Sequence, residues 1–557
     1  MVEKLLFPFA ITTLSLVACG GEGEDSGTTD SGTVEEVDRY DPEHLTVISM
    51  EMEEEDWDSL RHETRLFHEL ILGPECLQEP VPNIFEWYPG EVEVDGERLE
   101  NVGFRKKGLI GSLSYTRPSL KIDSDRFVDG QHFADGKERF TLNNGNQDPS
   151  RLHTCLSYQV LASAGLPAPR CSLATVEMNG ESLGVYANVE PIKSDFLLNN
   201  FGSDEGELYE GTASDFSEEL MLTFEMKEDD FTMEPIEELA EALQLSNDEL
   251  MGRLEELIDV EQFVTFWAAE GLIGHWDGYS QGTNNFYLYH DPADGLLRFI
   301  PWGVDATFEA PDASPLYVGG QLARRLYNHP DGLDMWYAES QRLLDEVWSE
   351  EAILAEIDRF EELITPHLLN ADYSLEMMEE VRGFVEERRE SVEAFLADSP
   401  DYYPWYIGER HCVDAIGELS ATFDLEWLEL IGEDSFEFSG TFDGEVNGEP
   451  LINEMVASVA GFDEHGTPLV SVIGIDEEFT NYHQLVLILH DSITPRTWDV
   501  DIAAITGYLI RAELGPFGQS EIVGLLGGEV TFDEVELEAG APVSGSVEAI
   551  IFPNIFE

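Results

Sequence analysis

The stretch NNFYLYHDPADGLLRFIPWGVD, from Asn284 to Asp305, predicts a β-hairpin with polar residues at both outer ends. Two apolar and aromatic segments flank an Asp-Gly turn, a pattern that is typical of paired antiparallel strands. Asp277, Asn284 and Asn285 come before the hairpin, and Asp305 closes it. Because a hairpin returns the chain to its starting edge, Asp277 and Asp305 are expected to face one cleft, although 28 positions separate them.

This arrangement of polar residues suits phosphoryl transfer. Asp277 could orient an attacking hydroxyl, while Asp305 with Asn284 or Asn285 could hold Mg²⁺ against phosphate groups. In so acidic a chain, paired acids beside a hairpin also arise from composition alone. The interpretation therefore needs a second signal elsewhere in the sequence.

The segment NVGFRKKGLIGSLSYTRPSLKID, residues 101–123, supplies that signal. Five of the 29 basic residues, among them Arg105 and Lys121, fall within 17 positions. Gly108, Gly111 and Ser112 lie between them, and glycines let backbone N–H groups approach a phosphate. Arg and Lys would supply the countercharge. The alternative is that these bases are solvated or paired with the abundant carboxylates.

Composition excludes some classes of function. The chain has 557 residues, too many for one ordinary domain, and 42% of them are hydrophobic, which is enough for real cores. Its 29 basic and 115 acidic residues give a formal charge of -86. Such a chain should repel nucleic acid and anionic lipid surfaces. The charge indicates a solvated surface suited to a salty habitat or, alternatively, one loaded with calcium.

The first residues predict export. A Lys and a short apolar run precede Leu-Val-Ala-Cys, so residues 1–18 are expected to be a signal peptide. The ending resembles a bacterial lipoprotein signal, in which Cys19 is lipidated and anchors the protein to the cell envelope, at the outer membrane or cell surface. The alternative is a plain signal peptide with an incidental Cys. Residues 19–44 predict a flexible acidic, Gly-Ser tether, and no other run is apolar enough to span a membrane.

Four further cysteines predict disulfides, because an even number is typical of exported proteins. Three pairings are possible. Cys155 and Cys171 bracket one step from helix to strand, which favours Cys155–Cys171 and Cys76–Cys412. Their spacing is not that of a zinc site.

Hydrophobic patterns divide the remaining chain into two domains. Residues 45–400 mix strands and helices, which predicts an α+β domain. Short alternating strands with Gly-rich turns dominate residues 413–557, which predicts an all-β domain of sandwich type. Within the first domain the patterns predict two hairpins, turning at Asp95-Gly96 and Asn179-Gly180, and helical regions over 235–275 and 333–398.

The first domain resembles the CotH family of spore-coat-type protein kinases, from about residue 45 to 395. Six motifs match in order: VGFRKKGLIGSLSYTRPSLKI, LNNGNQDPSRL, AGLPAPR, VEMNGESLGVYANVEPI, GELYEG and NNFYLYHDPADGLLRFIPWGVDATF. The resemblance implies an atypical kinase-like fold. It also implies transfer of phosphate from ATP, with Mg²⁺ or Mn²⁺, to Ser or Thr of a protein in the envelope or outside the cell.

The resemblance gives some residues a role at the phosphates. Lys121 in SLKI resembles the strand lysine that contacts them, and residues 108–112, with Gly108, Gly111 and Ser112, would form the loop over them. Arg105 would add countercharge. Glu190 in YANVE matches a family position that either meets the nucleotide or holds Lys121. The LNNGNQDPS stretch is expected to cap the next helix.

Other residues match the catalytic and metal-binding positions. Asp277 in HWDGY matches the catalytic-loop Asp, Asp305 the metal-binding Asp after the hairpin, and Asn284 or Asn285 would complete the metal shell. His275 is expected to cap or pack at a helix end. One departure concerns Gly303, because many members read Pro-Trp-Asp-X-Asp where this chain has Pro-Trp-Gly-Val-Asp.

Two alternatives stay open. The fold could serve as a non-catalytic binding module, an adhesin or surface scaffold, with the all-β domain holding a partner. Transfer of the nucleotide instead of phosphate would use the same metal and phosphate contacts. The sequence indicates neither the substrate protein nor the oligomeric state.

Overall fold

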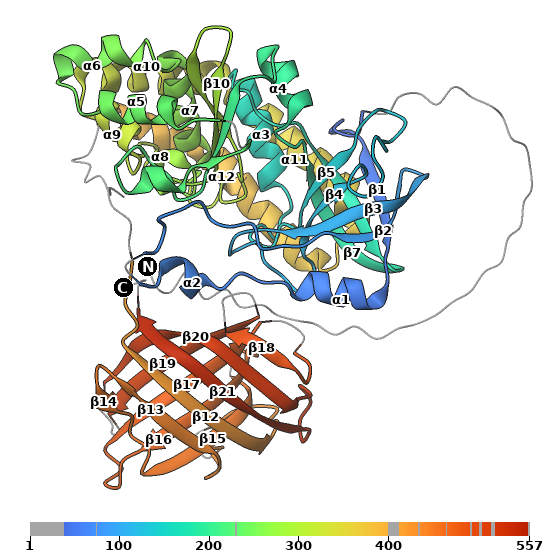
Figure 1. Cartoon of the computed structure of the whole chain (residues 1–557), viewed down its shortest axis with the longest axis vertical. Coiled ribbons are helices and arrows are strands. Elements are labelled where there is room, and N and C mark those ends of the chain that lie inside the picture. The colour runs from blue at the N-terminus through green and yellow to red at the C-terminus, as the bar shows by residue number, and fades with distance from the viewer. Residues whose placement is uncertain are drawn as a thin grey trace, which may run out of the picture. The chain divides into compact units, whose positions relative to one another are not determined.

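The structure is a computed structural model that describes residues 38–73, 75–228, 231–398, 412–432, 435–463, 465–490, 493–500, 504–513 and 519–554. The predicted signal peptide, Cys19 and most of the predicted tether lie outside these residues. The chain forms two compact units. The larger unit contains residues 39–65 and 69–412, and the C-terminal unit is built mainly from residues 413–557 (Figure 1).

The larger unit begins with a closed β-barrel in the strand order β1-β2-β3-β4-β5-β7-β6. β6 runs parallel to β1 and closes the barrel. Its strands are β1 (Leu45–Glu51), β2 (Tyr88–Val94), β3 (Glu97–Lys107), β4 (Ser119–Asp123), β5 (Arg139–Asn143), β6 (Cys171–Met178) and β7 (Glu181–Val189).

The turns of the two predicted barrel hairpins are confirmed. Asp95 and Gly96 connect β2 to β3 with φ of 51° and 83°, and Asn179 and Gly180 connect β6 to β7 with φ of 51° and 82°. Two consecutive positive φ values are the geometry that Asp-Gly and Asn-Gly pairs adopt at least cost. These turns fix the registers of the β2–β3 and β6–β7 pairs within the barrel.

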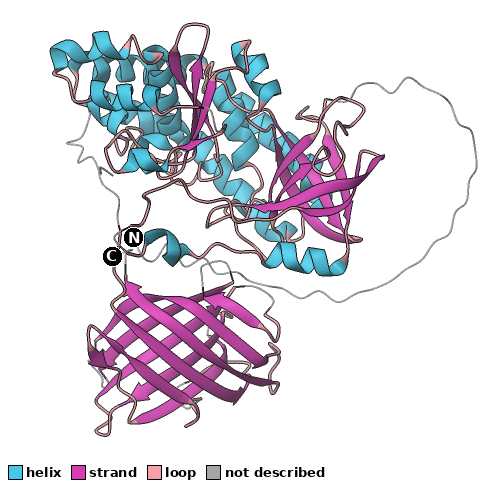
Figure 2. Cartoon of the chain, in the orientation of Figure 1, coloured by secondary structure: helices cyan, strands magenta, loops and turns pink. Residues whose placement is uncertain are grey.

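The second part of the larger unit has a four-stranded sheet in the order β11-β10-β8-β9, surrounded by helices (Figure 2). The predicted hairpin at Asn284–Asp305 is confirmed as the antiparallel pair β10–β11, in which Phe286 pairs with Pro301. The strands are β8 (Glu207–Gly211), β9 (Glu225–Met226), β10 (Phe286–Asp291) and β11 (Leu296–Pro301).

The predicted helical regions contain several shorter helices. The described helices are α1 (Glu54–His62), α2 (Phe67–Ile71), α3 (His153–Ser163), α4 (Ser194–Phe201), α5 (Glu234–Ala242), α6 (Asn247–Leu254), α7 (Val260–Ile273), α8 (Tyr279–Gly282), α9 (Gln321–Tyr327), α10 (Pro330–Glu346), α11 (Glu350–Ile364) and α12 (Ala371–Ala397), with 3₁₀ turns η2 (Leu220–Thr223) and η3 (Thr365–His367). None of the described helices is both long and apolar enough to cross a membrane.

α7 carries the chain to the candidate site, and both of its ends are defined locally. The side chain of Asp259 accepts a hydrogen bond from the Gln262 N–H at 3.1 Å, which caps the first turn. Gly274 ends the helix with φ of 72°, a left-handed conformation that glycine adopts without a steric cost. Fully buried Trp267 and Phe263 pack the helix into the main core.

Both predicted disulfides are present. Cys155 on α3 is bonded to Cys171 on β6, and Cys76 is bonded to Cys412. The first bond joins the helix that precedes the β6–β7 hairpin to the barrel itself. The second joins two segments that are 336 positions apart in the larger unit.

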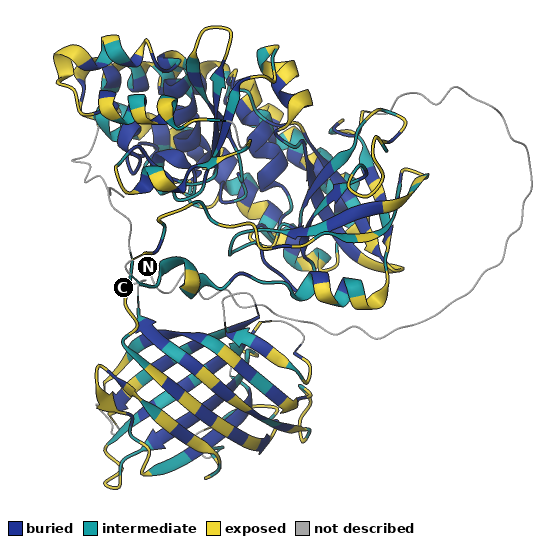
Figure 3. Ribbon diagram, viewed as in Figure 1, coloured by how far each residue is buried: buried dark blue, intermediate teal, exposed yellow. Residues whose placement is uncertain are grey.

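The prediction of an all-β C-terminal unit is confirmed, and the strands show the expected alternation of buried and exposed residues (Figure 3). All ten of its described strands belong to one hydrogen-bonded sheet, however, so the predicted sandwich of two separate sheets is not observed in the described part of this unit. The sheet curls, because Leu428 and Glu437, which follow β12, bridge to Gly461 and Ser458 on β15. The strands are β12 (Gly417–Glu426), β13 (Thr441–Val446), β14 (Glu449–Pro450), β15 (Met455–Phe462), β16 (Pro468–Ile475), β17 (Asn481–Leu489), β18 (Thr497–Val500), β19 (Ile505–Glu513), β20 (Ser520–Glu534) and β21 (Pro542–Pro553).

We predict that replacing Cys155 and Cys171 together by alanine lowers the free energy of unfolding of the larger unit by about 3 kcal/mol. A cross-link that closes a loop of this length restricts the unfolded chain by that order. Differential scanning calorimetry should show the transition of the larger unit at a lower temperature. The transition of the C-terminal unit is the internal control, and an unchanged larger-unit transition would contradict the prediction.

Candidate functional site

The basic segment places its side chains on two faces of the barrel. Arg105 on β3 pairs directly across from Lys121 on β4. Lys107 lies two residues further along β3 and therefore points to the same side as Arg105. Lys106 points the other way, is fully buried, and donates to the backbone oxygens of Arg61 and Glu63. Because side chains alternate along β3, Arg105 and Lys107 lie on the side of the candidate site, whereas Lys106 lies on the opposite side and has a structural role.

The carboxylate that acts electrostatically on Lys121 lies on β8. Glu210 lies near Lys121 and also forms an ion pair with a second lysine, Lys227, at 2.7 Å. The Tyr287 hydroxyl, on β10 opposite Glu210, hydrogen-bonds the same carboxylate. Burial lowers the pKa of Lys121 to about 8, and the nearby cations Lys107, Arg105 and Lys227 lower it further against the opposing effect of Glu210. So many cations around one carboxylate leave a local surplus of positive charge that would suit an anion.

Glu190 does not hold Lys121. Its buried carboxylate forms an ion pair with Arg170 at 2.6 Å, and its backbone N–H donates to the Arg170 carbonyl. Of the two roles that the resemblance allowed for Glu190, holding Lys121 is not observed, and Glu210 is the carboxylate that acts on Lys121. Contact of Glu190 with the nucleotide stays a prediction. The sequence held a signal for Glu210, since it lies in the GELYEG motif, but the pairing joins strands of different sheets that no local pattern connects.

The glycine loop after β3 is held by the LNNGNQDPS stretch. The Asn144 side chain donates to the Ser112 carbonyl at 3.0 Å, and the Asn146 side chain donates to the Gly111 carbonyl at 2.9 Å. Gly108 has φ of 131°, where a side chain would be strained and would meet Ser112 Oγ. The loop with Gly108, Gly111 and Ser112 therefore has a defined path directly after Lys107, and its place over phosphates stays a prediction.

The same stretch also fixes the start of α3. The Asp148 carboxylate accepts the N–H groups of Arg151 at 3.0 Å and His153 at 2.8 Å, which is the capping role expected from the sequence. The His153 ring shares a 2.9 Å hydrogen bond with the Asp305 carbonyl. α3 thus connects the glycine-loop anchor to the residue that closes the hairpin.

The predicted acidic half of the site comes together around Asp277. Asn285 donates to its carboxylate at 2.7 Å, and Asn284 donates at 3.3 Å. Burial raises the pKa of Asp277 to about 6, although His275 and the two amides oppose the rise, while the nearby Asp305 adds to it. A carboxyl group with this pKa is suited to accept a proton near neutral pH.

Asp305 lies between the two halves. Burial raises the pKa of its carboxyl group, whereas the ammonium group of Lys107 and the ring of His275 favour the charged form. Burial in turn lowers the pKa of Lys107 to about 8, with Asp305 and Glu210 acting against it. Lys107 therefore links the cations of the barrel to the carboxylates at the hairpin, a role that the sequence did not assign to it.

A buried carboxylate holds the loop that carries Asp277. Glu270 on α7 accepts the N–H groups of Tyr279 at 3.0 Å and Ser280 at 2.9 Å. His275 is also fully buried, 3.6 Å from Glu270, and its backbone N–H donates to the Glu270 carbonyl. His275 thus has the capping and packing role that its position predicted.

Gly303 occupies a position that accepts no side chain in this arrangement. Its φ is 56°, and an added Cβ would lie 2.4 Å from Oδ1 of Asn285. The Asp that many CotH-like chains have here would therefore displace Asn285. Asn285 itself has φ of 54°, which an Asn tolerates better than most residues.

Carboxylates and amides at the hairpin ends fit a hard divalent cation, because such ions prefer oxygen ligands. Asp305 lies close enough to Asp277 to raise its pKa, and a cation would relieve that repulsion. Within the described ranges no three His, Cys, Asp or Glu side chains group as a metal site. The set would therefore need the oxygens of Asn284 or Asn285, as the sequence predicted.

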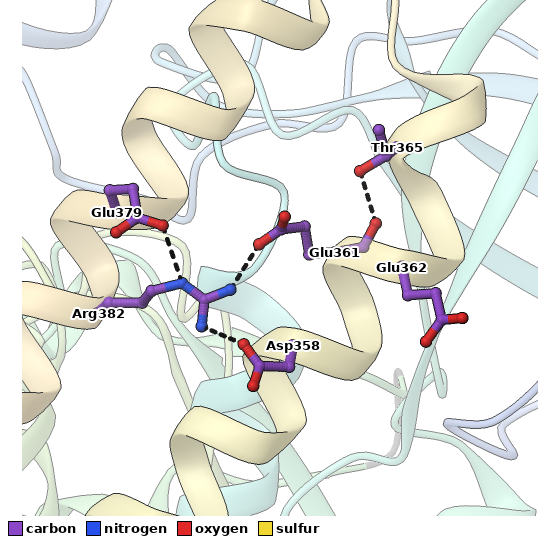
Figure 4. A pocket seen from close by; sticks show the side chains of 6 residues that line it. All are labelled: Asp358, Glu361, Glu362, Thr365, Glu379 and Arg382. Atoms are coloured by element: carbon purple, nitrogen blue, oxygen red, sulfur yellow. Dashed lines mark hydrogen bonds and ion pairs between the residues drawn. The ribbon is translucent and has the colours of Figure 1, made fainter.

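A groove of about 700 Å³ between α11 and α12 contains none of these residues (Figure 4). Arg382 lies in it and forms ion pairs with Asp358, Glu361 and Glu379. The groove is open and acidic, and its arginine is already paired with three carboxylates, so nothing in it indicates a ligand.

A lysine–glutamate pair next to a loop with glycines, facing two carboxylates and two amides at a hairpin, defines a kinase-like protein. The chain belongs to the family described as CotH kinase protein, which matches residues 104–411, more than half of its length.

Curated relatives support this assignment. The chain is 23% identical to inner spore coat protein H of Bacillus subtilis over 259 residues, which are 43% of this chain and 68% of that protein. It is 24% identical to spore coat protein homolog 1 of Rhizopus delemar, over 36% of this chain and 37% of that protein. It is 25% identical to invasin CotH7 of the same fungus, over 32% of each. The chain thus spans about a third of the length of these fungal relatives.

One solved structure, the Helicobacter pylori proinflammatory kinase CtkA, aligns with 50% of this chain and 92% of its own at 12% identity. The TM-score of 0.25 is too low to support an argument.

We predict that Asp277→Asn stabilises the larger unit at pH 7.5 by about 2 kcal/mol when EDTA is present. The folded pKa lies above the unfolded one, so ionisation costs stability, and the free energy of unfolding of the wild type falls between about pH 4 and pH 6. Urea unfolding across this range should show a smaller fall in the variant than in the wild type, because Asp215, whose pKa burial raises to about 7, contributes to the fall in both.

Asp294→Asn in the same hairpin is the matched control. Hydrogen bonds from Arg298 lower the pKa of Asp294, so this variant should lose stability at neutral pH and approach the wild type in acid. Parallel pH curves for Asp277→Asn and the wild type would contradict the prediction.

We predict that Gly303→Ala lowers the free energy of unfolding by more than Gly295→Ala does. Both glycines have positive φ, so both variants carry the strain of about 1 kcal/mol. Gly295 has open space around it, whereas Gly303 meets Asn285. The difference in urea unfolding measures the Asn285 contact, and equal losses would show that Asn285 is free to move.

Proposed function

We propose that the larger unit transfers the γ-phosphoryl group of ATP, with Mg²⁺ or Mn²⁺, to Ser or Thr of a protein in the envelope or outside the cell. One observation carries the proposal. Lys107 lies between a phosphate-type cation cluster around Glu210 and the paired carboxylates Asp277 and Asp305.

Each group has a part in this proposal. Lys121 and Lys107 bind the nucleotide phosphates, and Glu210 holds Lys121 in place. Asp277 orients the acceptor hydroxyl and takes its proton. Asp305 with Asn284 or Asn285 would hold the divalent cation, which when bound would neutralise charge on the phosphates.

Export is supported by the two disulfides, which form in oxidising compartments, and by relatives named as spore-coat proteins and invasins. These observations suggest an exported or surface protein. Lipid attachment through Cys19 remains part of the proposal and rests on the sequence alone.

A binding module on the same fold is the second candidate. The fungal relatives named invasins, and the replacement of an expected carboxylate by Gly303, favour it. A module of this kind would keep the fold without needing the nucleotide. Nucleotide transfer is a variant of the first candidate, and intact mass of the product separates it because AMP would stay on the target.

We predict metal-dependent binding of ATP by the full chain in isothermal titration calorimetry. Lys121→Ala should weaken binding about tenfold or more, because a charge-assisted contact to phosphate is lost. Asp305→Ala should remove the difference between Mg²⁺ and EDTA.

Arg98→Ala is the matched control, since it removes one cation from β3 outside the site, where Arg98 pairs with Glu51 and Glu91. No binding at millimolar ATP with either metal, by a folded protein, would contradict the proposal and favour the binding module.

A further inference from the structure

The C-terminal end of α7 raises a question of hydrogen-bond accounting. The last carbonyl groups of a helix have no partners inside the helix and need them elsewhere. The Glu270 carbonyl accepts from the His275 N–H, and the Ile273 carbonyl accepts from the Phe308 N–H at 3.0 Å. The carbonyls of Gly271 and Leu272 lie between them, and the Gly271 carbonyl accepts one bond from the Gly274 N–H at 3.2 Å.

One side chain from α12 serves both of these carbonyls. Arg388 donates to the Gly271 oxygen at 2.5 Å and to the Leu272 oxygen at 3.0 Å. Its other terminal nitrogen donates to the carbonyls of Pro311 at 2.8 Å and Ala313 at 2.6 Å. The side chain is fully buried, so these four bonds are made away from water.

These bonds join the two segments that carry the acidic half of the site. Asp277 follows the α7 end by four residues, and Asp305 precedes Phe308 by three. The backbone approach is close as well, because a Cβ on Gly271 would lie 1.8 Å from the Pro315 oxygen. A planar guanidinium with several fixed donors can hold both segments at once, whereas a lysine ammonium cannot span them.

We propose that Arg388 is a positioning residue that sets the separation of Asp277 and Asp305. It touches neither carboxylate and acts through the backbone of α7 and of residues 311–313. The expected effect of Arg388 on metal and nucleotide binding rests on the proposed function. Its expected effect on the two backbone segments rests on the hydrogen bonds alone.

Hydrogen exchange followed by mass spectrometry tests the second part on the full chain. In Arg388→Lys, residues 274–283 and 305–316 should lose protection together, by about tenfold or more. Arg388→Met should do the same if Arg388→Lys keeps part of the network. Unchanged protection of both segments in both variants would overturn the proposal.

Arg325→Lys is the matched control. Arg325 on α9 donates to the carbonyls of Leu243 at 2.8 Å and Leu245 at 2.9 Å, at the end of α5, and so caps a helix that carries no residue of the site. It should loosen that end and leave residues 274–283 and 305–316 protected. Equal loss in these segments for Arg325→Lys would show a general loss of stability and overturn the proposal.

Calorimetry with ATP tests the first part. In Arg388→Lys the affinity measured in EDTA, which depends on Lys121 and Lys107, should stay within about twofold, while the gain on adding Mg²⁺ falls about tenfold or more. An undiminished gain would overturn the proposal. If the wild type shows no gain, the proposed function fails, and the exchange experiment still decides the role of Arg388.

Discussion

The Glu270 carboxylate is the constraint on which the acidic half of the site depends. It is buried in the core, where a charge is costly unless hydrogen bonds satisfy it. The N–H groups of Tyr279 and Ser280 provide those bonds, and they can reach Glu270 only if the chain turns sharply after α7. That turn is the loop from Gly274 to Gly278, and it presents Asp277. The need to satisfy one buried acid therefore shapes the loop that holds another.

The cationic half has a different physical basis. Lys107 and Lys121 stand on adjacent barrel strands, so their closeness follows from strand pairing, and their repulsion must be offset. Glu210 offsets it from a different sheet. In a chain with a formal charge of -86, the acids elsewhere would repel a nucleotide, which makes this local surplus of cations more significant than its number suggests.

Local patterns accounted for the elements and for much of the site. The turns at Asp95-Gly96 and Asn179-Gly180, the hairpin before Asp305, the disulfides and the grouping of Asn284 and Asn285 with Asp277 follow from turn chemistry and spacing. The sequence left open whether Glu190 holds Lys121 or meets the nucleotide, and it gave no sign that Glu210 acts on Lys121, because this carboxylate comes from another sheet and strand periodicity does not encode that neighbour. The role of Lys107 could not be predicted without knowing which side of β3 each side chain points to. The neighbouring Lys106 points to the other side, where it is buried and donates to backbone carbonyls. The curled single sheet of the C-terminal unit likewise depends on bridges between distant segments.

The departure at Gly303 is best understood together with Asn285. The two residues face each other across the end of the hairpin, and the Trp302 N–H donates to the Asn285 carbonyl at 3.2 Å, so their backbones are fixed together. A side chain at 303 and the observed position of the Asn285 amide exclude each other. The absence of a side chain at position 303 and the placement of the Asn285 amide beside Asp277 therefore depend on each other. The Asn285 amide N–H donates to the Asp277 carboxylate, where a further carboxylate at 303 would have raised the pKa of Asp277.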